Sequence, residues 1–223
     1  MRTVCITVAE NDNDCYPRMG GMRGNREAQS TTLSRTKQHF ADRGVDAQFF
    51  RGINAPKLGI ETKNPYLVDG PPPPGQEPFN VGSRVVGCWL SHRALWAALL
   101  LLPDEHFLVL EDDAIFPEGW RERFDRAMAD VPADFDVLYV GSCCAMDKPR
   151  TLVRGEVWDV RYPFCTHGYV VARKALPVLI ETQDAATCYG PIDVSMAMHS
   201  FPRLKVYTVL PRLLEQYATG IPQ

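Results

Sequence analysis

The hydrophobic pattern of the chain alternates between short, strongly apolar runs and longer segments whose apolar residues recur at helical spacing. The short runs predict strands at residues 3–9, 46–51, 106–110, 136–140, 168–172 and 204–210. The longer segments predict helices at residues 26–43, 84–102, 118–128 and 173–182, with a short helix near Ile192. Strands that alternate with helices indicate an α/β fold with a mainly parallel central sheet and helices on both faces.

The run from His106 to Leu110 is apolar throughout and leads directly into three consecutive acids. A continuous apolar run is typical of a strand that is buried on both faces of a sheet. We therefore expect this strand near the centre of the sheet. The acids at its carboxyl end are Glu111, Asp112 and Asp113.

Prolines interrupt the segment from residue 54 to residue 83, including the run Pro71 to Pro74. They remove backbone donors and restrict φ, so an irregular insertion is expected around 54–83. A length of 223 residues is ordinary for one folding unit. We expect a single domain over residues 1–223 that contains this insertion.

Composition and charge narrow the class of protein. The chain is 45% hydrophobic with a formal net charge of −3, so it has no overall basic excess to bind a nucleic acid. The N-terminal apolar run is too short for a signal peptide, and the longest apolar run, Ala94 to Leu102, is too short to cross a bilayer. We expect a cytoplasmic protein without a transmembrane segment, and peripheral attachment to a membrane stays open. The seven cysteines form no CxxC pair, so we expect reduced, mostly buried thiols.

The three acids are the strongest candidates for chemistry. In a continuing strand Glu111 and Asp113 would point to one side, about 6–7 Å apart, and Asp112 to the other. Such a pair suits Mg²⁺ or Mn²⁺, and the carboxyl ends of strands are where open α/β sheets bind ligands. Alternatively, an aspartate here begins a turn before Pro117, because Asp favours turns.

Four blocks of sequence resemble the successive signatures of glycosyltransferase family 25, which contains lipopolysaccharide β-galactosyltransferases and procollagen galactosyltransferases. The blocks are Gly87–His92, Leu108–Asp113, Asp136–Gly141 and His167–Val171. Weaker matches to the same family are Arg26, Ala55, Pro211 and Gln216. Two features depart from the pattern of this family, Val85 and the loop 10–24, and both bear on donor preference and activity.

The resemblance implies a GT-A-type nucleotide-binding fold and an inverting transfer of a hexose, with galactose favoured. The donor would be a nucleotide-diphosphate sugar, UDP-linked, and the acceptor a hydroxyl of a glycan or a protein. It also implies Mn²⁺ or Mg²⁺ held by the acidic segment, with Glu111 and Asp113 as ligands. Residues expected to contact the donor are Arg26, His92, Asp112, His167 and Gln216.

Inversion requires a general base that takes the proton of the acceptor hydroxyl, and Asp193 is the candidate. An aspartate in a first helical turn also simply complements the helix dipole. His92 shares a helical face with two tryptophans, which favours a core histidine over a ligand. For His167 the favoured alternative is a strand-end histidine bonded to backbone. For Arg26, a solvated arginine is the alternative to a phosphate or uracil contact.

Three other functions compete with this interpretation of the sequence. A metal-dependent nucleotidyltransferase also needs carboxylates beside a triphosphate, but it releases pyrophosphate rather than a nucleoside diphosphate. A non-catalytic binding protein could keep the fold without turnover. A dinucleotide-binding dehydrogenase is disfavoured because no GxGxxG follows the first strand.

Overall fold

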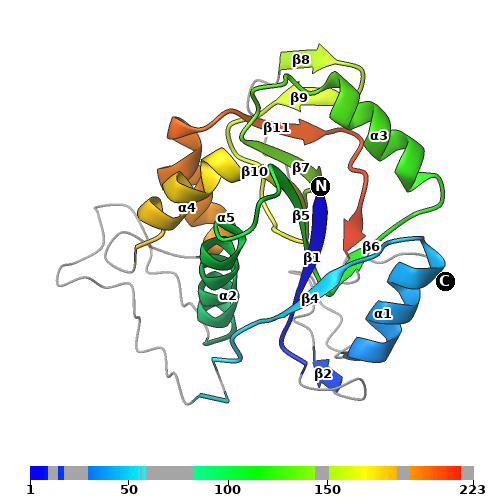
Figure 1. Ribbon diagram of the computed structural model, residues 1–223, viewed down its shortest axis with the longest axis vertical. Helices are drawn as coiled ribbons and strands as arrows, with labels where there is room; N and C mark the ends of the chain where they lie inside the picture. The colour runs from blue at the N-terminus through cyan, green and yellow to red at the C-terminus, as the bar shows by residue number, and fades with distance from the viewer. Residues whose placement is uncertain are drawn as a thin grey trace.

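The chain folds around one large sheet (Figure 1). A computed structural model describes residues 1–9, 15–17, 30–55, 57–58, 83–143, 151–184 and 191–216. The sheet has eight strands in the order β4-β1-β5-β10-β7-β11-β9-β8. They are β1 (Arg2–Thr7), β4 (Gln48–Arg51), β5 (His106–Glu111), β7 (Val137–Gly141), β8 (Thr151–Arg154), β9 (Val157–Asp159), β10 (Gly168–Ala172) and β11 (Val206–Val209).

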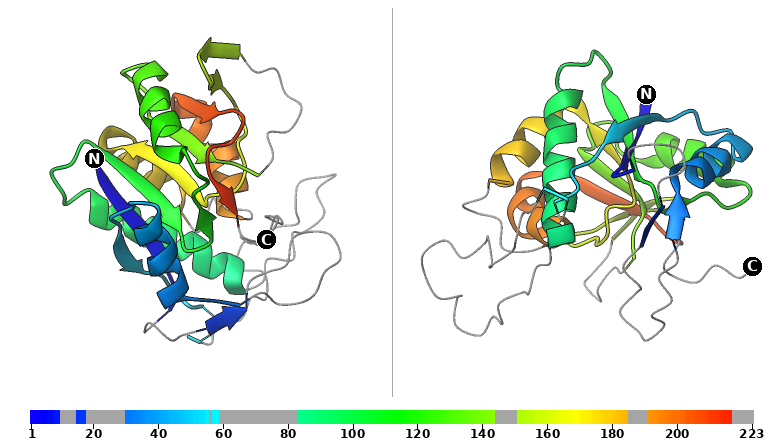
Figure 2. Two further views of the ribbon diagram at one scale, coloured as in Figure 1. Left: turned by 90° about the vertical axis from the view of Figure 1, so that its right-hand side faces the viewer. Right: turned by 90° about the horizontal axis from the view of Figure 1, so that it is seen from below.

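Helices cover the sheet on both faces, as predicted. They are α1 (Leu33–Asp42), α2 (Ser83–Leu99), α3 (Trp120–Asp130), α4 (Leu176–Thr182) and α5 (Ile192–Ser195), with the short turns η1 (Arg173–Ala175), η2 (Met196–Ser200) and η3 (Phe201–Arg203). Helices α2, α4 and α5 lie on one side of the sheet, and α1 and α3 on the other (Figures 1 and 2). Within the described residues, no helix combines the length and the apolar character needed to span a bilayer.

The strand directions confirm a mainly parallel sheet. Strand β1 is parallel to both β4 and β5, and β11 is parallel to β7. Strand β10 is antiparallel to both β5 and β7, and β9 is antiparallel to β11 and β8. Within the eight-stranded sheet, the strands other than β9 and β10 therefore share one direction, so β1, β5, β7 and β11 end at the same edge.

Strand β5 separates two hydrophobic cores, because successive side chains of a strand point to opposite faces. Phe107 and Val109 pack into the core under α2 and α4, while Leu108 and Leu110 pack into the core under α1 and α3. Burying each such side chain contributes about 1.5–3 kcal/mol. The prediction of a strand buried on both faces is thus confirmed.

The first helix is shorter than predicted. It begins at Leu33 rather than Arg26, because residues Ser30–Thr32 form β3 and pair with β2 (Cys15–Pro17). Its end agrees with the prediction: Gly44 has φ +66°, and the Val45 N–H donates to the Phe40 carbonyl over 2.8 Å. A left-handed residue after the last turn favours glycine.

The hairpin β8–β9 was not predicted. The side chains of β8 are exposed throughout, so this edge strand carries no alternating hydrophobic pattern. The prolines of the predicted 54–83 insertion, from Pro56 onward, lie outside the described residues, and the single-domain organisation stays a prediction.

After β11 the chain returns to the edge of the sheet where β5 ends. The N–H groups of Leu213 and Leu214 both donate to the Val140 carbonyl over 2.8 Å. Strand β12 (Glu215–Gln216) then pairs with β6 (Ala114–Ile115), with Gln216 opposite Ala114. The pairing brings the C-terminal segment next to the acidic residues.

Candidate functional site

The three acids follow the end of β5, at the edge of the sheet where the parallel strands end, as their place in the sequence predicted. Strand β5 ends at Glu111, and Asp112 and Asp113 form a turn before β6. The alternation of side chains along a strand therefore does not extend to Asp113. The segment is therefore a strand end, as the metal-site interpretation of the sequence expects, and also a turn, as the alternative interpretation expects.

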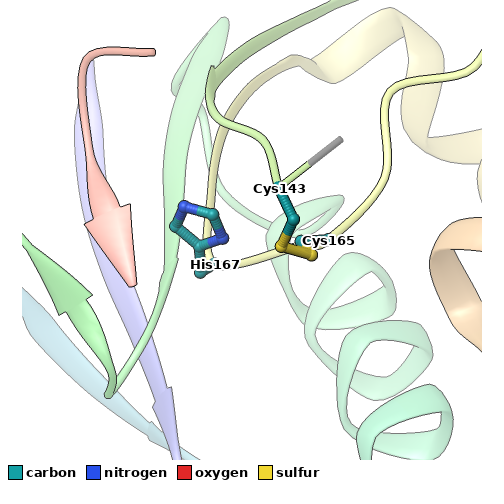
Figure 3. Close-up of side chains that lie close together, drawn as sticks. All are labelled: Cys143, Cys165 and His167. Carbon is teal, nitrogen blue, oxygen red and sulfur yellow. A yellow bond between two sulfur atoms is a disulfide. The ribbon is translucent and has the colours of Figure 1, made fainter. Parts of the chain in front are cut away.

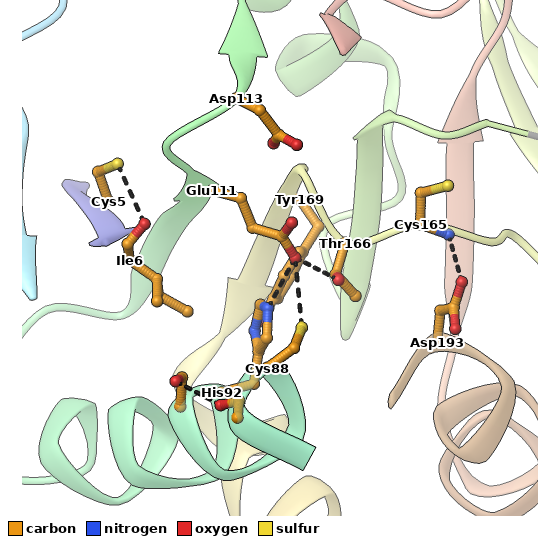
Figure 4. Close-up of polar contacts among 12 residues, drawn as sticks. Cys5, Ile6, Cys88, His92, Glu111, Asp113, Cys165, Thr166, Tyr169 and Asp193 are labelled. Carbon is orange, nitrogen blue, oxygen red and sulfur yellow. Dashed lines mark hydrogen bonds and ion pairs between the residues drawn. The ribbon is translucent and has the colours of Figure 1, made fainter. Parts of the chain in front are cut away.

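The Glu111 carboxylate is held by donors from α2 and from the segment before β10 (Figure 4). Its Oε1 accepts hydrogen bonds from His92 Nε2 at 3.1 Å and from Thr166 Oγ1 at 2.5 Å. The Cys88 Sγ lies 3.8 Å from the same oxygen. Burial acts to raise the pKa of Glu111, but the bonds from His92 and Thr166 outweigh it and lower the pKa to about 2. The side chain is therefore a fixed anion.

A chain of hydrogen bonds indicates which ring nitrogen of His92 donates to Glu111. Trp96 Nε1 can only donate, and it donates to the Tyr169 hydroxyl over 2.9 Å. The Tyr169 proton is then available for His92 Nδ1, also at 2.9 Å. With Nδ1 as acceptor, the proton of the ring lies on Nε2, which donates to Glu111. His92 is fully buried with both ring nitrogens bonded, which is the arrangement of a core histidine.

The block Gly87–His92 also joins α2 to the loop after β4. Ser91 Oγ donates to the Gly87 carbonyl over 2.6 Å and accepts from the Ile53 N–H over 2.7 Å. A Cβ at Gly87 would lie 2.6 Å from the Ile53 carbonyl oxygen, so this close approach requires glycine. The structure thus gives most of the block a positioning role.

Asp112 and Asp113 both line a cavity of about 170 Å³, together with Arg35, Thr36 and His39. Burial and the neighbouring Asp113 carboxylate raise the pKa of Asp112 to about 8, against a hydrogen bond from the Thr7 hydroxyl that lowers it. A divalent cation between two such carboxylates would remove this repulsion and take hard oxygen ligands. The donor set therefore fits a magnesium-type or manganese-type ion, and the pair of Glu111 and Asp113 as its ligands stays a prediction.

Gln216 is brought to Asp113 by the pairing of β12 with β6. Its Nε2 donates to Asp113 Oδ2 over 2.9 Å, and Asp113 is 9% exposed. The two residues are 103 positions apart, so no local pattern predicts the contact. The family resemblance alone identified Gln216 as a site residue.

Asp193 lies at the start of α5 and accepts two backbone hydrogen bonds. Its Oδ2 accepts from the Cys165 N–H and its Oδ1 from the Val194 N–H, each over 2.8 Å. These contacts are those of a helix-start carboxylate, and the bond to Cys165 also ties α5 to the segment before β10. They fix the direction of the carboxylate without using all of its lone pairs.

His167 is completely buried beside the acids. Its backbone carbonyl accepts the Glu111 N–H over 3.1 Å, and its Nε2 lies 3.4 Å from the Leu214 carbonyl. Burial lowers the pKa of His167, while the charges of Asp113 and Glu111 act against that shift. Its Nδ1 is buried without a hydrogen-bond partner. Arg26, the remaining predicted donor contact, lies outside the described residues.

The expectation of reduced thiols is wrong for one pair of cysteines. Cys143 and Cys165 form a disulfide, with their Cα atoms 5.6 Å apart, inside the usual disulfide range. They meet because β7 pairs with β10, which places Gly141 opposite Gly168. Cys5 and Cys88 take part in no disulfide, in agreement with the expectation. A separation of 22 residues in sequence gave no signal of this pairing.

Sequence comparisons connect the chain to one family. The profile of glycosyltransferase family 25 (LPS biosynthesis protein) matches residues 28–151. A "Glycosyltransferase 25 family member" of Anopheles gambiae is 25% identical over 177 residues, which cover 76% of this chain and 29% of that protein. "Procollagen galactosyltransferase 1" of Danio rerio is 24% identical over 185 residues, covering 80% of this chain and 28% of that protein.

A relative with a different description is the human "Inactive glycosyltransferase 25 family member 3", which is 36% identical over 73 residues, or 31% of this chain and 12% of that protein. The chain thus spans less than a third of the length of the relatives it matches. Among solved structures, a glycosyltransferase involved in the glycosylation of the major capsid of PBCV-1 superposes with a TM-score of 0.50 at 9% identity. That alignment covers 99% of this chain and 93% of the other, and it confirms the predicted fold class.

Proposed function

Because this chain belongs to glycosyltransferase family 25, we propose that it transfers a hexose from a nucleotide-diphosphate sugar to an acceptor hydroxyl. Galactose from a UDP-linked donor is the favoured substrate, and a glycan such as a lipopolysaccharide sugar, or a protein, carries the acceptor. One observation carries the proposal: Asp112 and Asp113 line a single cavity where β5 leaves the sheet. Ligands of open α/β sheets bind at such strand ends.

Asp112 and Asp113 are the residues that would hold Mn²⁺ or Mg²⁺. When bound, the ion neutralises charge on the diphosphate leaving group. Gln216 orients Asp113 through its 2.9 Å hydrogen bond, and Thr36 Oγ1 donates to the Asp112 carbonyl over 3.0 Å. These contacts hold the turn in place before the donor binds, which reduces the reorganisation needed at the moment of transfer.

Glu111 has a different part in this proposal from its two neighbours. Its Oε1 already accepts bonds from His92 and Thr166, which fix the direction of the carboxylate. We assign it the role of anchoring the end of β5 to α2 and to the segment before β10. Its negative charge also acts on the neighbouring His167.

Asp193 is the proposed general base of an inverting transfer. It would accept the proton of the acceptor hydroxyl as the new glycosidic bond forms and the nucleoside diphosphate leaves. The N–H groups of Cys165 and Val194 hold its carboxylate in a fixed direction, which favours a reproducible geometry for proton transfer.

The direct test is turnover by the whole chain. UDP release from UDP-galactose and from other UDP-hexoses is measured with Mn²⁺, with Mg²⁺ and with a chelator, over a panel of glycan and peptide acceptors. The expected result is acceptor-dependent and metal-dependent release of UDP. Pyrophosphate release from a nucleoside triphosphate would instead indicate a nucleotidyltransferase.

A non-catalytic role is the second candidate, and the relative named inactive is the observation that favours it. This alternative predicts that UDP and metal bind while no acceptor increases UDP release. The variant Asp193→Asn separates the two functions. In a transferase it keeps donor binding and lowers kcat by about 10²–10⁴-fold, whereas in a binding protein it changes nothing measurable.

A further inference from the structure

Three side chains of types that commonly bind metal ions converge beside the proposed donor site (Figure 3). One potential ligand atom from each of Cys143, Cys165 and His167 lies within 4.8 Å of the other two. Cys143 follows β7, while Cys165 and His167 precede β10, and the pairing of these strands brings the two segments together. In the structure the two sulfurs are joined as a disulfide.

The ring of His167 supplies an independent indication of a ligand. His167 is 0% exposed, and its Nδ1 has no hydrogen-bond partner. Figure 3 shows this nitrogen on the side of the ring that faces the two sulfurs, whereas Nε2 points away from them. A buried polar atom without a partner is unfavourable, and a ligand bound at this position would provide one.

We propose that the thiol form of this cluster binds a zinc-type divalent ion through Cys143 Sγ, Cys165 Sγ and His167 Nδ1. Thiolate and imidazole ligands select Zn²⁺ over Mg²⁺ or Mn²⁺, which take oxygen ligands. Tetrahedral Zn²⁺ with Zn–S bonds of about 2.3 Å places two thiolates nearly 4 Å apart. Rotation about the two Cα–Cβ bonds can supply that separation from a Cα–Cα distance of 5.6 Å.

Formation of the site from the disulfide balances in two steps. A dithiol reductant donates two electrons and two protons to the Cys143–Cys165 bond and becomes a disulfide itself. Binding of Zn²⁺ then displaces the two thiol protons into solvent, and both thiolates and the imidazole coordinate the ion. A water molecule takes the fourth position, which the partial exposure of both cysteines makes accessible.

Either cross-link would hold the same part of the candidate site. The Cys165 N–H binds the Asp193 carboxylate over 2.8 Å, and the next residue, Thr166, binds Glu111 over 2.5 Å. A disulfide or a zinc ion at Cys165 thus fixes the segment that orients both acids. The cluster is a site for a soft metal in addition to the hard-metal site at Asp112 and Asp113, and its existence does not depend on transferase activity.

A second cluster, formed by Cys88, His92 and Glu111, has similar spacing but different surroundings. Both nitrogens of His92 are already bonded, and Glu111 accepts from His92 and Thr166. Coordination there would break a satisfied hydrogen-bond network, so this cluster is the internal control rather than the proposed site.

The test uses the full chain after reduction and removal of metal with a chelator. Co²⁺ is titrated in as a spectroscopic substitute for Zn²⁺, because cobalt bound to thiolates absorbs in the near ultraviolet and tetrahedral cobalt absorbs strongly in the visible. Zn²⁺ is then added to displace it. The variants are Cys143→Ser and Cys165→Ser, with Cys88→Ser and Cys144→Ser as controls, the latter because Cys144 is the neighbouring thiol in the sequence.

We expect Co²⁺ bound to the reduced wild-type chain to give thiolate charge-transfer bands that Zn²⁺ abolishes. The bands should disappear in Cys143→Ser and Cys165→Ser, persist in both controls, and be absent from the oxidised chain. A reduced wild-type chain without the bands would overturn the proposal. So would bands that survive Cys143→Ser or that depend on Cys88. Far-ultraviolet circular dichroism of each variant confirms that loss of the bands is not loss of the fold.

Discussion

At the scale of single residues, the side-chain direction of Glu111 is set by contacts that are distant in sequence. The apolar run of β5 predicted where the acids emerge, and that position is correct. The partners of Glu111, however, are His92 and Thr166, which lie 19 and 55 residues away. Local spacing carries no information about such contacts. The pairing of Asp113 with Glu111 expected from strand geometry was therefore beyond what the sequence could decide.

The low pKa of Glu111 predicts a specific dependence of stability on pH. A carboxyl whose pKa is lower in the folded protein stabilises the fold above its unfolded pKa, and the contribution is lost as pH falls toward the folded pKa. For Glu111 the window runs from the ordinary value of 4.5 down to about 2. We expect the free energy of unfolding of Glu111→Gln to fall less steeply with acidification than that of the wild type, by roughly 1–3 kcal/mol in total.

Urea unfolding in chelator-containing buffer, from about pH 5.5 to about pH 3, measures this difference. Glu122→Gln is the control, since Glu122 is an exposed residue on α3 and should leave the wild-type slope unchanged. Identical slopes for wild type and Glu111→Gln would show that the hydrogen bonds from His92 and Thr166 do not depress the pKa of Glu111.

The hydroxyl of Tyr169 makes a second prediction at this scale. Tyr169→Phe removes one oxygen and leaves both Trp96 Nε1 and His92 Nδ1 without their 2.9 Å partner in a buried site. The expected loss is about 1–3 kcal/mol of unfolding free energy, measured by urea denaturation. Tyr207→Phe, at a half-buried tyrosine of β11, is the matched control and should change stability by less. Equal effects of the two substitutions would contradict the proposed hydrogen-bond chain.

At the scale of elements, the sequence predicted those whose pattern is dictated by burial. Strand β5 is apolar because both faces are covered, and α1 ends where Gly44 takes a left-handed conformation. The hairpin β8–β9 was missed because β8 is exposed and pairs through its backbone. The start of α1 was misplaced because the β2–β3 pairing competes with helix formation there.

The contact between α2 and the loop after β4 depends on Gly87. In most helix interiors, replacing glycine by alanine stabilises the helix by up to about 1 kcal/mol. At Gly87 the new Cβ would lie 2.6 Å from the Ile53 carbonyl oxygen, so backbone must move. We expect Gly87→Ala to destabilise the protein by roughly 1–3 kcal/mol.

Thermal unfolding measures the effect of this substitution. Ala97→Gly, on the exposed face of the same helix, is the companion variant and should also lower stability, by about 1 kcal/mol, through helix propensity alone. The two variants therefore test opposite exchanges, glycine to alanine and alanine to glycine, within one helix. An increase in melting temperature for Gly87→Ala would mean that the close approach of α2 to the Ile53 loop is not rigid.

At the scale of the whole molecule, the fold gathers one edge of the sheet into the candidate site. Residues from α2, from the end of β5, from the segment before β10 and from β12 meet there, although they span positions 88 to 216. The fold class follows from the alternation of strands and helices, but this convergence depends on the strand order. The antiparallel insertion of β10 between β5 and β7 is the feature that places Thr166 and His167 beside the acids.

A metal and a nucleotide that bind together at this edge should stabilise the entire fold. Ligand at about 100 times its Kd adds roughly 2.7 kcal/mol, which corresponds to a rise in melting temperature of about 5–10 °C for a chain of this size. UDP with Mn²⁺ should produce that rise, whereas either component alone should produce less, because each carboxylate of Asp112 and Asp113 needs the cation to face a diphosphate. Asp113→Asn should abolish the joint effect, and Asp125→Asn, at an exposed position of α3, should preserve it. Two results would place the nucleotide elsewhere: a full shift with UDP in chelator, or an undiminished shift in Asp113→Asn. The proposed site is the feature of this edge that makes donor binding depend on both the metal and the Asp113 carboxylate.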